Sequence, residues 1–140
     1  MIKSKNLKEY LKDDNSCRPV AYMRKRILIA EDEGLSRRWL TAWLRDIGYD
    51  VSEAKDGVEA LELLDTCVFD LVLSDIRMPR VDGIAVITHL HSISPDTPCI
   101  VLSASPNDAD RLSGMLGAIV ISKPFLLEDL ESKIRFLLER

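Results

Sequence analysis

The sequence predicts an α/β fold in which a doubly wound parallel sheet of five strands carries helices on both faces. Short apolar runs, too short for helices, alternate along the chain with segments whose apolar residues recur at steps of three and four. Several runs end on a polar residue, at the sheet edge where open α/β folds bind their ligands. Because parallel strands need right-handed crossovers, this alternation predicts helices on both faces. At 140 residues, the chain is expected to hold one main domain.

Charge divides the chain into a basic N-terminal extension and an acidic domain. Residues 1–26 carry eight Lys or Arg against three Asp or Glu, whereas residues 27–140 carry eleven against twenty. We expect residues 1–24, which are lysine-rich and weakly patterned, to form a flexible extension, and residues 25–140 to form the domain. An acidic domain is a poor candidate for direct nucleic-acid binding, which relies on neutralising phosphates.

Hydropathy and cysteine content favour a cytoplasmic protein without a membrane partner. No apolar stretch reaches membrane-spanning length, and the N-terminus lacks the apolar core of a secretory signal. Cys17, Cys67 and Cys99 are an odd number of cysteines without metal-ligand spacing. We therefore expect reduced thiols in a reducing compartment.

The first part of the domain predicts a strand, a helix and a second strand. Residues 27–30 are a continuous apolar run, typical of a strand buried on both faces, and acidic residues follow it. From 35 to 47, apolar residues recur at helical spacing, which predicts an amphipathic helix ended by Gly48. Residues 50–54 are half polar, so we expect this strand near the edge of the sheet.

The middle of the chain predicts two helices on either side of a buried strand. Apolar residues at helical spacing predict the helices over 58–64 and 84–93. Between them, residues 71–75 form a short apolar run, which predicts a strand buried on both faces that ends on Asp75.

The last third predicts two further strands, each followed by a helix. Residues 99–103 form a buried strand that ends on a hydroxyl, and residues 119–122 form a fifth strand followed by Lys123. The helix over 107–116 has few apolar anchors and is expected among the more mobile elements. The closing helix over 127–138 has a continuous apolar stripe.

Several polar side chains are predicted to meet at the carboxyl edge of this sheet. They stand at the ends of four different strands and are Glu31, Asp32, Asp75, Ser103 and Lys123. A single aspartate at a strand end is ordinarily a structural residue that turns into a loop. The convergence of all five side chains on one edge favours a functional site instead.

The residue types at this edge suit phosphoryl transfer assisted by a metal ion. Neighbouring carboxylates repel one another, so the cluster needs a cation, and hard oxygen ligands suit Mg²⁺, with Mn²⁺ as a substitute. A metal beside Asp75, with the Lys123 ammonium on the other side, would neutralise an incoming phosphoryl group. The Asp75 carboxylate would then form an acyl phosphate, and the Ser103 hydroxyl would donate to a phosphate oxygen.

The sequence closely resembles the receiver domain of two-component response regulators over roughly residues 25–140. The matching segments are Ile27-Leu28-Ile29-Ala30-Glu31-Asp32-Glu33, Leu71-Val72-Leu73-Ser74-Asp75-Ile76-Arg77-Met78-Pro79, Asp82-Gly83, Val101-Leu102-Ser103-Ala104 and Lys123-Pro124-Phe125. As a set in this order, they are highly specific. The resemblance implies the flavodoxin-like (βα)5 fold with strand order 2-1-3-4-5, and a cis bond between Lys123 and Pro124.

The resemblance also implies roles for the acidic residues. Asp75 resembles the phosphoacceptor, and Glu31 and Asp32 resemble the acidic pair that holds Mg²⁺ together with Asp75. The backbone carbonyl of Arg77 is implied as a further metal ligand. Glu31 departs from the more usual aspartate, and its longer side chain should still reach the metal, directly or through water.

Two further site residues concern the conformational switch, and so does one position at which the sequence departs from the family pattern. By resemblance, Ser103 is the hydroxyl switch residue and Lys123 is the lysine that pairs with the phosphate. Val120 stands three residues before this lysine, where the family often carries an aromatic residue that swings inward on activation. An aliphatic side chain cannot make that swing, so the readout is expected to depend on Ser103 and on the helix over 107–116.

The resemblance implies a signalling domain rather than an enzyme, one that assists its own phosphorylation and dephosphorylation. Its phosphodonor would be a sensor histidine kinase or a phosphotransfer protein. Phosphorylation would change the binding of a downstream protein, or drive homodimerisation, on the face formed by the fourth helix, the fifth strand and the fifth helix. We expect a stand-alone receiver, or one excised from a longer protein.

Three other interpretations stay open. An aspartate-nucleophile phosphatase shares the strand-end aspartate, Mg²⁺ and lysine, but usually has a second aspartate at the position of Arg77. A flavodoxin-type FMN binder needs a hydroxyl- and glycine-rich loop after the first strand, and the acidic residues 31–33 would repel its phosphate. A degenerate receiver would usually lack one of the key residues, and all of them are present here.

Overall fold

The computed structural model describes residues 24–105, 107, 108, 112 and 117–139. Its strands are β1 (Arg26–Ala30), β2 (Asp50–Ala54), β3 (Leu71–Asp75), β4 (Cys99–Ser103) and β5 (Ile119–Ser122). Its helices are α2 (Gly34–Asp46), α3 (Gly57–Thr66), α4 (Gly83–Ile93) and α6 (Leu127–Leu138). The strands form one parallel sheet in the order β2-β1-β3-β4-β5, which confirms the predicted fold class and strand order.

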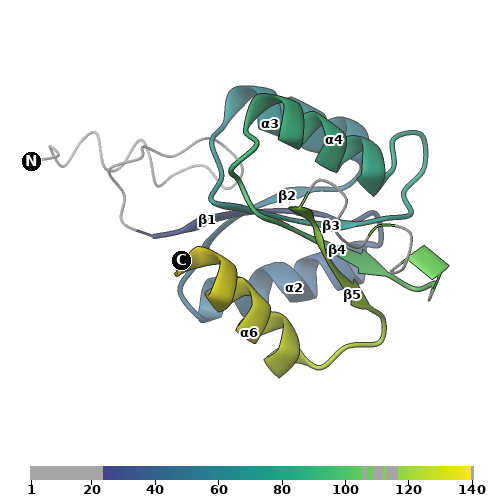
Figure 1. The fold of residues 1–140 in the computed structure, drawn as a ribbon. Coiled ribbons are helices and arrows are strands. Elements are labelled where there is room, and N and C mark those ends of the chain that lie inside the picture. Colours follow the sequence, from purple (N-terminus) through teal and green to yellow (C-terminus); the bar gives the residue numbers. More distant parts are fainter. Residues whose placement is uncertain (1–23, 106, 109–111, 113–116, 140) are drawn as a thin grey trace, which may run out of the picture.

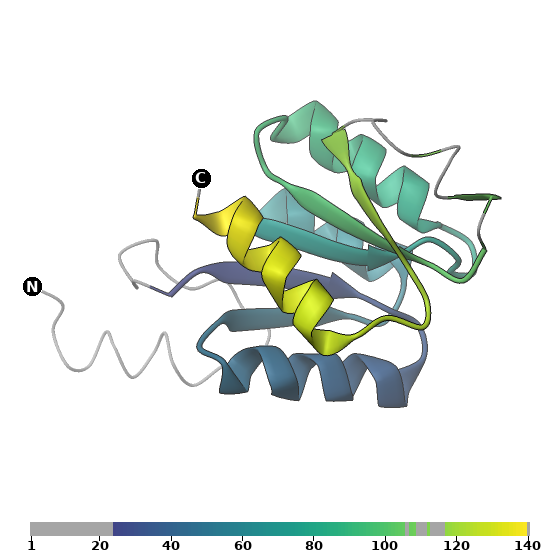
Figure 2. The same ribbon diagram turned by 60° about the horizontal axis from the view of Figure 1, so that its bottom comes forward.

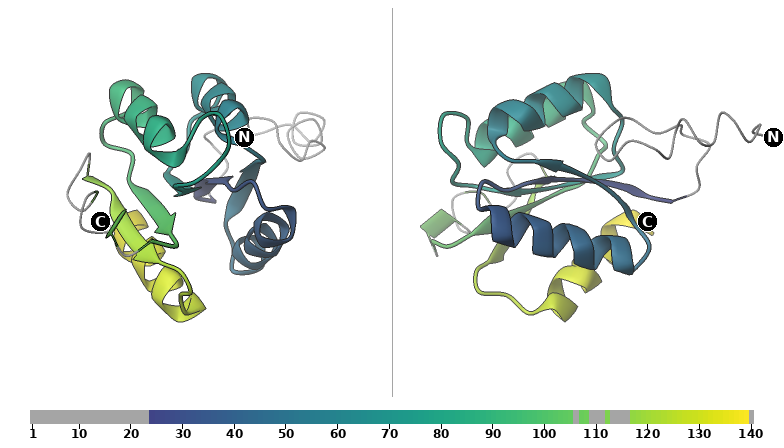
Figure 3. Two further views of the ribbon diagram at one scale, coloured as in Figure 1. Left: turned by 90° about the vertical axis from the view of Figure 1, so that its right-hand side faces the viewer. Right: turned by 180° about the vertical axis from the view of Figure 1, so that it is seen from behind.

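The helices cover the sheet on both faces. Figure 1 shows α3 and α4 on one face and α2 and α6 on the other. Figure 2 brings α2 and α6 forward, and both panels of Figure 3 keep the two helix pairs on opposite sides of the sheet. The predicted doubly wound arrangement is therefore confirmed, and β2 lies at the sheet edge as its half-polar sequence predicts.

The core consists of two layers because each inner strand is apolar on both faces. In β1, Ile27 and Ile29 pack in the same cluster as Leu44 of α2, whereas Leu28 packs in the cluster that contains Val86 of α4. These side chains are no more than 1% exposed. Such strands read as continuous apolar runs, which is why the sequence predicts them well.

The strand register brings the carboxyl ends of the inner strands to a common edge. Ala30 of β1 pairs with Ser74 of β3, and Asp75 pairs with Leu102 of β4. Ser103, the last residue of β4, pairs with Ser122. The residue that follows each strand therefore emerges at the same end of the sheet.

Three helices, α2, α3 and α4, begin at this edge with an acidic cap. The Glu33 carboxylate accepts a hydrogen bond from the backbone N–H of Ser36 at 2.8 Å, and Asp82 caps α4 in the same way. A Cβ atom on Gly83, the first residue of α4, would lie 2.1 Å from the backbone oxygen of Asp75. Only glycine allows α4 to start this close to the end of β3.

Two predicted segments lie largely outside the described residues. These are the basic extension over 1–24 and the helix over 107–116, of which the structure describes only residue 24 and residues 107, 108 and 112. Both therefore stay predictions. Among the described helices, none combines the length and apolar character needed to cross a membrane.

The expectation of three reduced thiols is wrong. Cys67, next to the end of α3, is disulfide-bonded. Cys99, at the start of β4, is a free thiol, and burial raises its pKa to about 11. An odd number of cysteines requires only that one thiol stays unpaired, so the count alone could not exclude a disulfide.

Candidate functional site

Three carboxylates meet at the carboxyl edge of the sheet, as predicted. Glu31 and Asp32 follow β1 and Asp75 ends β3, and each offers an oxygen within 4.8 Å of those of the other two. Glu31 is 3% exposed and Asp75 is 9% exposed, whereas Asp32 faces solvent. The cluster is thus buried on one side and open to solvent on the other.

Lys123 brings a compensating positive charge into this cluster. Its Nζ atom lies 2.5 Å from Oδ1 of Asp75 and 3.6 Å from Oε1 of Glu31. Burial lowers the pKa of this ammonium, but the hydrogen bond and charge of Asp75, together with the charge of Glu31, raise it by more. Lys123 is therefore fully charged at neutral pH.

The backbone around Lys123 fixes where its side chain begins. The Lys123 N–H donates to the carbonyl oxygen of Ser103 at 2.7 Å, which ties the end of β5 to the end of β4. The bond from Lys123 to Pro124 is cis, as the resemblance predicted. The hydrogen bond to Ser103 thus places Lys123 at the sheet edge where the acidic cluster lies.

The protonation of Glu31 reflects its buried and negative surroundings. Desolvation raises its pKa most, and the hydrogen bond and charge of Asp75 raise it further, to about 7, although Lys123 lowers it. Glu31 therefore titrates near neutral pH in the metal-free protein. A divalent cation at this position would favour the charged form.

The donor atoms at this site fit a hard divalent cation. The cluster offers three carboxylates, and that of Asp32 is open to solvent. Oxygen-rich sites with few protein ligands and access to solvent suit Mg²⁺, which retains several waters. The backbone of the loop after β3 is held by a hydrogen bond from the Gly83 N–H to the Ile76 oxygen. Arg77 follows at once in this loop, and its carbonyl as a metal ligand stays a prediction.

Ser103 reaches the predicted edge, and its hydroxyl is hydrogen-bonded to the segment after β4. It lies 2.9 Å from the Ser105 carbonyl oxygen and 3.0 Å from Oδ2 of Asp108, and it accepts a hydrogen bond from the Ser105 N–H at 3.1 Å. All these partners belong to the segment after β4. In this structure, Ser103 is therefore bonded to its own loop.

Sequence reasoning missed Asp108 as a partner of the site. This aspartate is 4% exposed, and its Oδ2 atom lies 3.6 Å from Nη2 of Arg77 as well as near Ser103. The pattern of residues 107–116 gave no sign of it because a weak helical stripe does not show which polar side chain is buried. The sequence signal that could have located Asp108 is a carboxylate five residues after a hydroxyl at a strand end, because one turn of chain brings the two groups within hydrogen-bonding distance.

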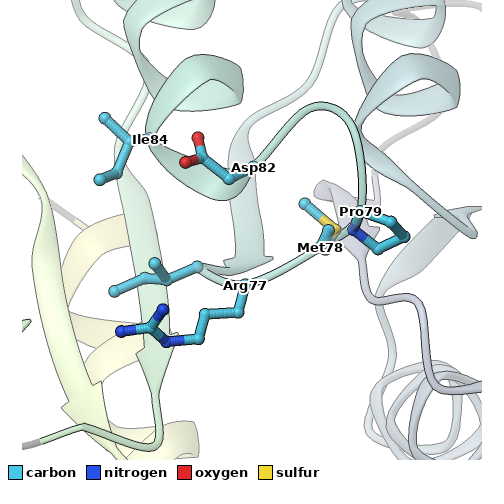
Figure 4. A pocket seen from close by; sticks show the side chains of 6 residues that line it. Arg77, Met78, Pro79, Asp82 and Ile84 are labelled. Carbon is cyan, nitrogen blue, oxygen red and sulfur yellow. The ribbon is translucent and has the colours of Figure 1, made fainter.

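A groove of about 390 Å³ opens beside the site along the loop between β3 and α4. Figure 4 shows Arg77, Met78 and Pro79 on this loop and Asp82 and Ile84 at the start of α4. The Arg77 side chain points away from Met78 and Pro79. The loop after β3 therefore directs the Arg77 guanidinium towards one end of the groove.

Val120, where the resemblance implied the loss of an aromatic switch, is partly buried in β5. It pairs with Val101 of β4 and packs against the core cluster on the α3 and α4 side. A short branched side chain in this position has little freedom at χ1. That Val120 does not swing on activation stays a prediction.

Comparison with known proteins gives a match over most of the chain. The family model described as the response regulator receiver domain matches residues 27–135. Response regulator MprA of Mycobacterium sp. (strain KMS) is 41% identical over 120 residues, which cover 84% of this chain and 52% of that protein. The probable transcriptional regulator ycf27 of Cyanophora paradoxa is 43% identical over 119 residues, 84% of this chain and 49% of that protein. The chain spans about half the length of these curated relatives.

Solved structures show the same fold. Response regulator protein TrrA from Thermotoga maritima, solved in complex with Mg²⁺-BeF, gives a TM-score of 0.76 at 32% identity and covers 81% of this chain and 99% of that one. Chemotaxis response regulator CheY4 of Vibrio cholerae gives a TM-score of 0.75 at 28% identity, with 83% and 100% covered. By its strand order and by the match of the family model, the chain belongs to the response regulator receiver domain family.

Proposed function

We propose that this domain accepts a phosphoryl group on Asp75 from a phosphohistidine of a sensor histidine kinase or a phosphotransfer protein. The observation that carries the proposal is the contact between the Asp75 carboxylate and the Lys123 ammonium, 2.5 Å apart, inside a cluster with two more carboxylates. An aspartate that only ends a strand would not need a lysine ammonium and two further carboxylates beside it. The relatives named as response regulators support the same role.

The residues of the chain suit in-line transfer. A carboxylate oxygen of Asp75 attacks phosphorus, and the bond between phosphorus and the donor imidazole nitrogen breaks. The electron pair of that bond leaves with the imidazole, which departs as a neutral ring when its other nitrogen carries a proton. Lys123 then pairs with a phosphoryl oxygen, and Ser103 turns its hydroxyl towards another.

Glu31, Asp32, Asp75 and the carbonyl of Arg77 are the groups that would hold Mg²⁺. When bound, Mg²⁺ neutralises charge on the phosphoryl oxygens, and Mn²⁺ is the expected substitute. The donor set of the acidic cluster supports this assignment. So does the similarity to TrrA, which was solved with Mg²⁺-BeF.

The output of the domain is proposed to be a change in protein contacts. Ser103 lies next to the segment between β4 and β5, which with β5 and α6 would form the face that binds a downstream protein or a second phosphorylated copy. The domain would act in the cytoplasm as a signalling module that assists its own phosphorylation and dephosphorylation. It would not turn over an independent substrate.

Incubation with acetyl phosphate and Mg²⁺ tests the central claim. Intact-protein mass spectrometry should show the addition of one phosphoryl group. Borohydride reduction of the acyl phosphate, followed by peptide mapping, should mark position 75. Asp75→Asn should take up no label, whereas Asp96→Asn, an exposed aspartate in the turn before β4, should be labelled like the unmodified protein.

Two outcomes would contradict the proposal. Labelling that persists in Asp75→Asn would place the acceptor elsewhere. Many turnovers of a phosphate monoester would favour the phosphatase interpretation, in which the phosphoaspartate is an intermediate of an enzyme and not a signal.

A further inference from the structure

The Ser103 hydroxyl both donates and accepts hydrogen bonds in the structure. It has one proton to donate, and two acceptors compete for it: the Ser105 carbonyl oxygen at 2.9 Å and Oδ2 of Asp108 at 3.0 Å. Its oxygen also accepts from the Ser105 N–H at 3.1 Å. Both hydrogen-bonding functions of the hydroxyl are thus committed to the segment after β4.

The backbone of Ser103 is held independently of this side chain. Its carbonyl oxygen accepts a hydrogen bond from the Lys123 N–H at 2.7 Å, and it is 2% exposed at the end of β4. Any approach of the hydroxyl to a group on Asp75 must therefore come from rotation of the side chain. What resists that rotation is the set of bonds that the hydroxyl already makes.

Asp108 would lose a hydrogen-bond donor if the Ser103 hydroxyl rotated away. Its carboxylate is 4% exposed, and a buried charge is costly unless donors surround it. Arg77 lies 3.6 Å away, but its side chain is 73% exposed, so water screens that ion pair. The hydrogen bond from Ser103, at 3.0 Å, is buried, and bonds to ionised acceptors are stronger than neutral ones.

We propose that Asp108 is a positioning residue that holds the Ser103 hydroxyl away from Asp75 and so opposes the switch to the phosphorylated state. The inference rests on the proposed function, since it concerns the same phosphoryl site. Rotation of Ser103 towards Asp75 removes a donor from the buried Asp108 carboxylate. The unphosphorylated state is thereby favoured, and a phosphoryl group must bind the hydroxyl more strongly than Asp108 does.

Binding of beryllofluoride, a stand-in for the phosphoryl group, tests this proposal in the presence of Mg²⁺. Asp108→Ala should bind beryllofluoride about fivefold to tenfold more tightly, the effect expected when a bond to a charged group no longer has to be broken. Asp108→Asn keeps an acceptor without the charge, so its gain should be smaller. The affinity for Mg²⁺ alone should not change in either variant.

A double-mutant cycle separates positioning from a general effect on the fold. In a Ser103→Ala background, Asp108→Ala should have no effect on beryllofluoride binding, because no hydroxyl is left to hold. Asn107→Ala, an exposed neighbour in the same turn, is the matched control and should bind like the unmodified protein. An equal gain with and without Ser103, or no gain at all, would overturn the proposal. Should Asp108→Ala not fold, Asp108→Asn takes its place in the cycle.

A measurement without any phosphoryl analogue distinguishes this proposal from the proposed function. The Ser105 N–H donates to the Ser103 oxygen, so Asp108→Ala should release the hydroxyl and speed amide exchange at Ser105 in the metal-free protein. Unchanged exchange would count against the positioning role. If the unmodified protein binds no beryllofluoride but exchange at Ser105 does rise, the proposed function fails while the role of Asp108 stands.

Discussion

The Nζ atom of Lys123 lies 2.5 Å from Oδ1 of Asp75 and 3.6 Å from Oε1 of Glu31, so one ammonium serves two nearly buried carboxylates. Lys123 follows β5, Asp75 ends β3 and Glu31 follows β1, so their meeting depends on the register of the whole sheet. With Asp32 at the rim, the site keeps an excess of negative charge. This excess is what a divalent cation would neutralise.

Replacing Lys123 by glutamine should destabilise the metal-free protein and strengthen its binding of Mg²⁺. Without the ammonium, the carboxylates of Asp75 and Glu31 repel each other, and we expect the free energy of unfolding at pH 7 to fall by about 1–2 kcal/mol, less than for a fully buried pair because Lys123 is partly exposed. Urea denaturation with and without Mg²⁺ measures both effects, and Mg²⁺ should restore more stability to the variant than to the unmodified protein. Lys133→Gln, at an exposed position on α6, is the control. If Lys123→Gln were as stable as the unmodified protein, the ion pair would contribute nothing to the free energy of unfolding.

Binding of Mg²⁺ should weaken as the pH falls below about 7. Burial raises the pKa of Glu31 from 4.5 to about 7, so between these values the folded metal-free protein holds a proton that the unfolded chain does not. Glu31 therefore lowers the stability of the metal-free protein as the pH rises through this window. Since Mg²⁺ needs the charged carboxylate, its affinity should fall by up to about tenfold per pH unit below the pKa of Glu31.

Calorimetry in two buffers of different ionisation enthalpy measures this coupling directly. At pH 6, binding of Mg²⁺ should release close to one proton, and at pH 8 almost none. Glu31→Gln should bind Mg²⁺ more weakly and without this proton release. A glutamine variant that still releases the proton would assign the titration to another group.

The sequence predicts the sheet and the main site residues for the same physical reason. Strands buried on both faces are continuous apolar runs, so the one or two polar residues that close each run mark the strand end, and parallel strands bring these ends to one edge. Glu31, Asp75 and Lys123 could be located in this way without any structure. Helix bounds follow from the spacing of apolar residues, and the observed helices begin and end within two residues of the predicted positions.

Features that depend on loop geometry could not be predicted in this way. The burial of Asp108 depends on a single turn, in which its N–H donates to the Ser105 oxygen at 3.2 Å. The bonding of Cys67 depends on which chain segments meet, which a cysteine count does not reveal. The close approach of Gly83 to Asp75 is likewise a matter of three-dimensional packing, although the sequence marks the turn.

Gly83→Ala should displace the end of β3 and impair the site. The new Cβ atom would lie 2.1 Å from the Asp75 oxygen and 2.9 Å from the Asp75 carbonyl carbon, and backbone atoms cannot move aside cheaply. We expect a loss of about 2–3 kcal/mol in unfolding free energy, as for other overpacked sites, together with slower labelling by acetyl phosphate. Gly34→Ala is the matched control, since Gly34 also begins a helix and its new Cβ would meet only the end of Arg37 at 3.8 Å. Equal stability of the two variants would show that α4 moves freely relative to β3.

Substitutions of Arg80 should separate the cost of its backbone strain from the contribution of its ion pair to stability. It has a φ of 70°, a conformation that costs a non-glycine residue about 1 kcal/mol or more, and its guanidinium lies 2.7 Å from Oδ2 of Asp56. Asp56 also caps α3 through Oδ1, so the pair links the loop after β3 to a neighbouring helix. Arg80→Ala keeps the strain and loses the pair, whereas Arg80→Gly loses both.

Arg80→Gly should therefore be more stable than Arg80→Ala by about 1 kcal/mol in urea denaturation, even though both variants lack the guanidinium. The additional freedom of glycine in the unfolded chain makes this difference smaller than the strain itself. In an Asp56→Asn background, Arg80→Ala should lower the free energy of unfolding by less, because the carboxylate charge with which Arg80 pairs is gone. An alanine variant as stable as the glycine variant would mean that the loop relaxes to a negative φ, and that the observed φ of Arg80 is maintained by its contact with Asp56.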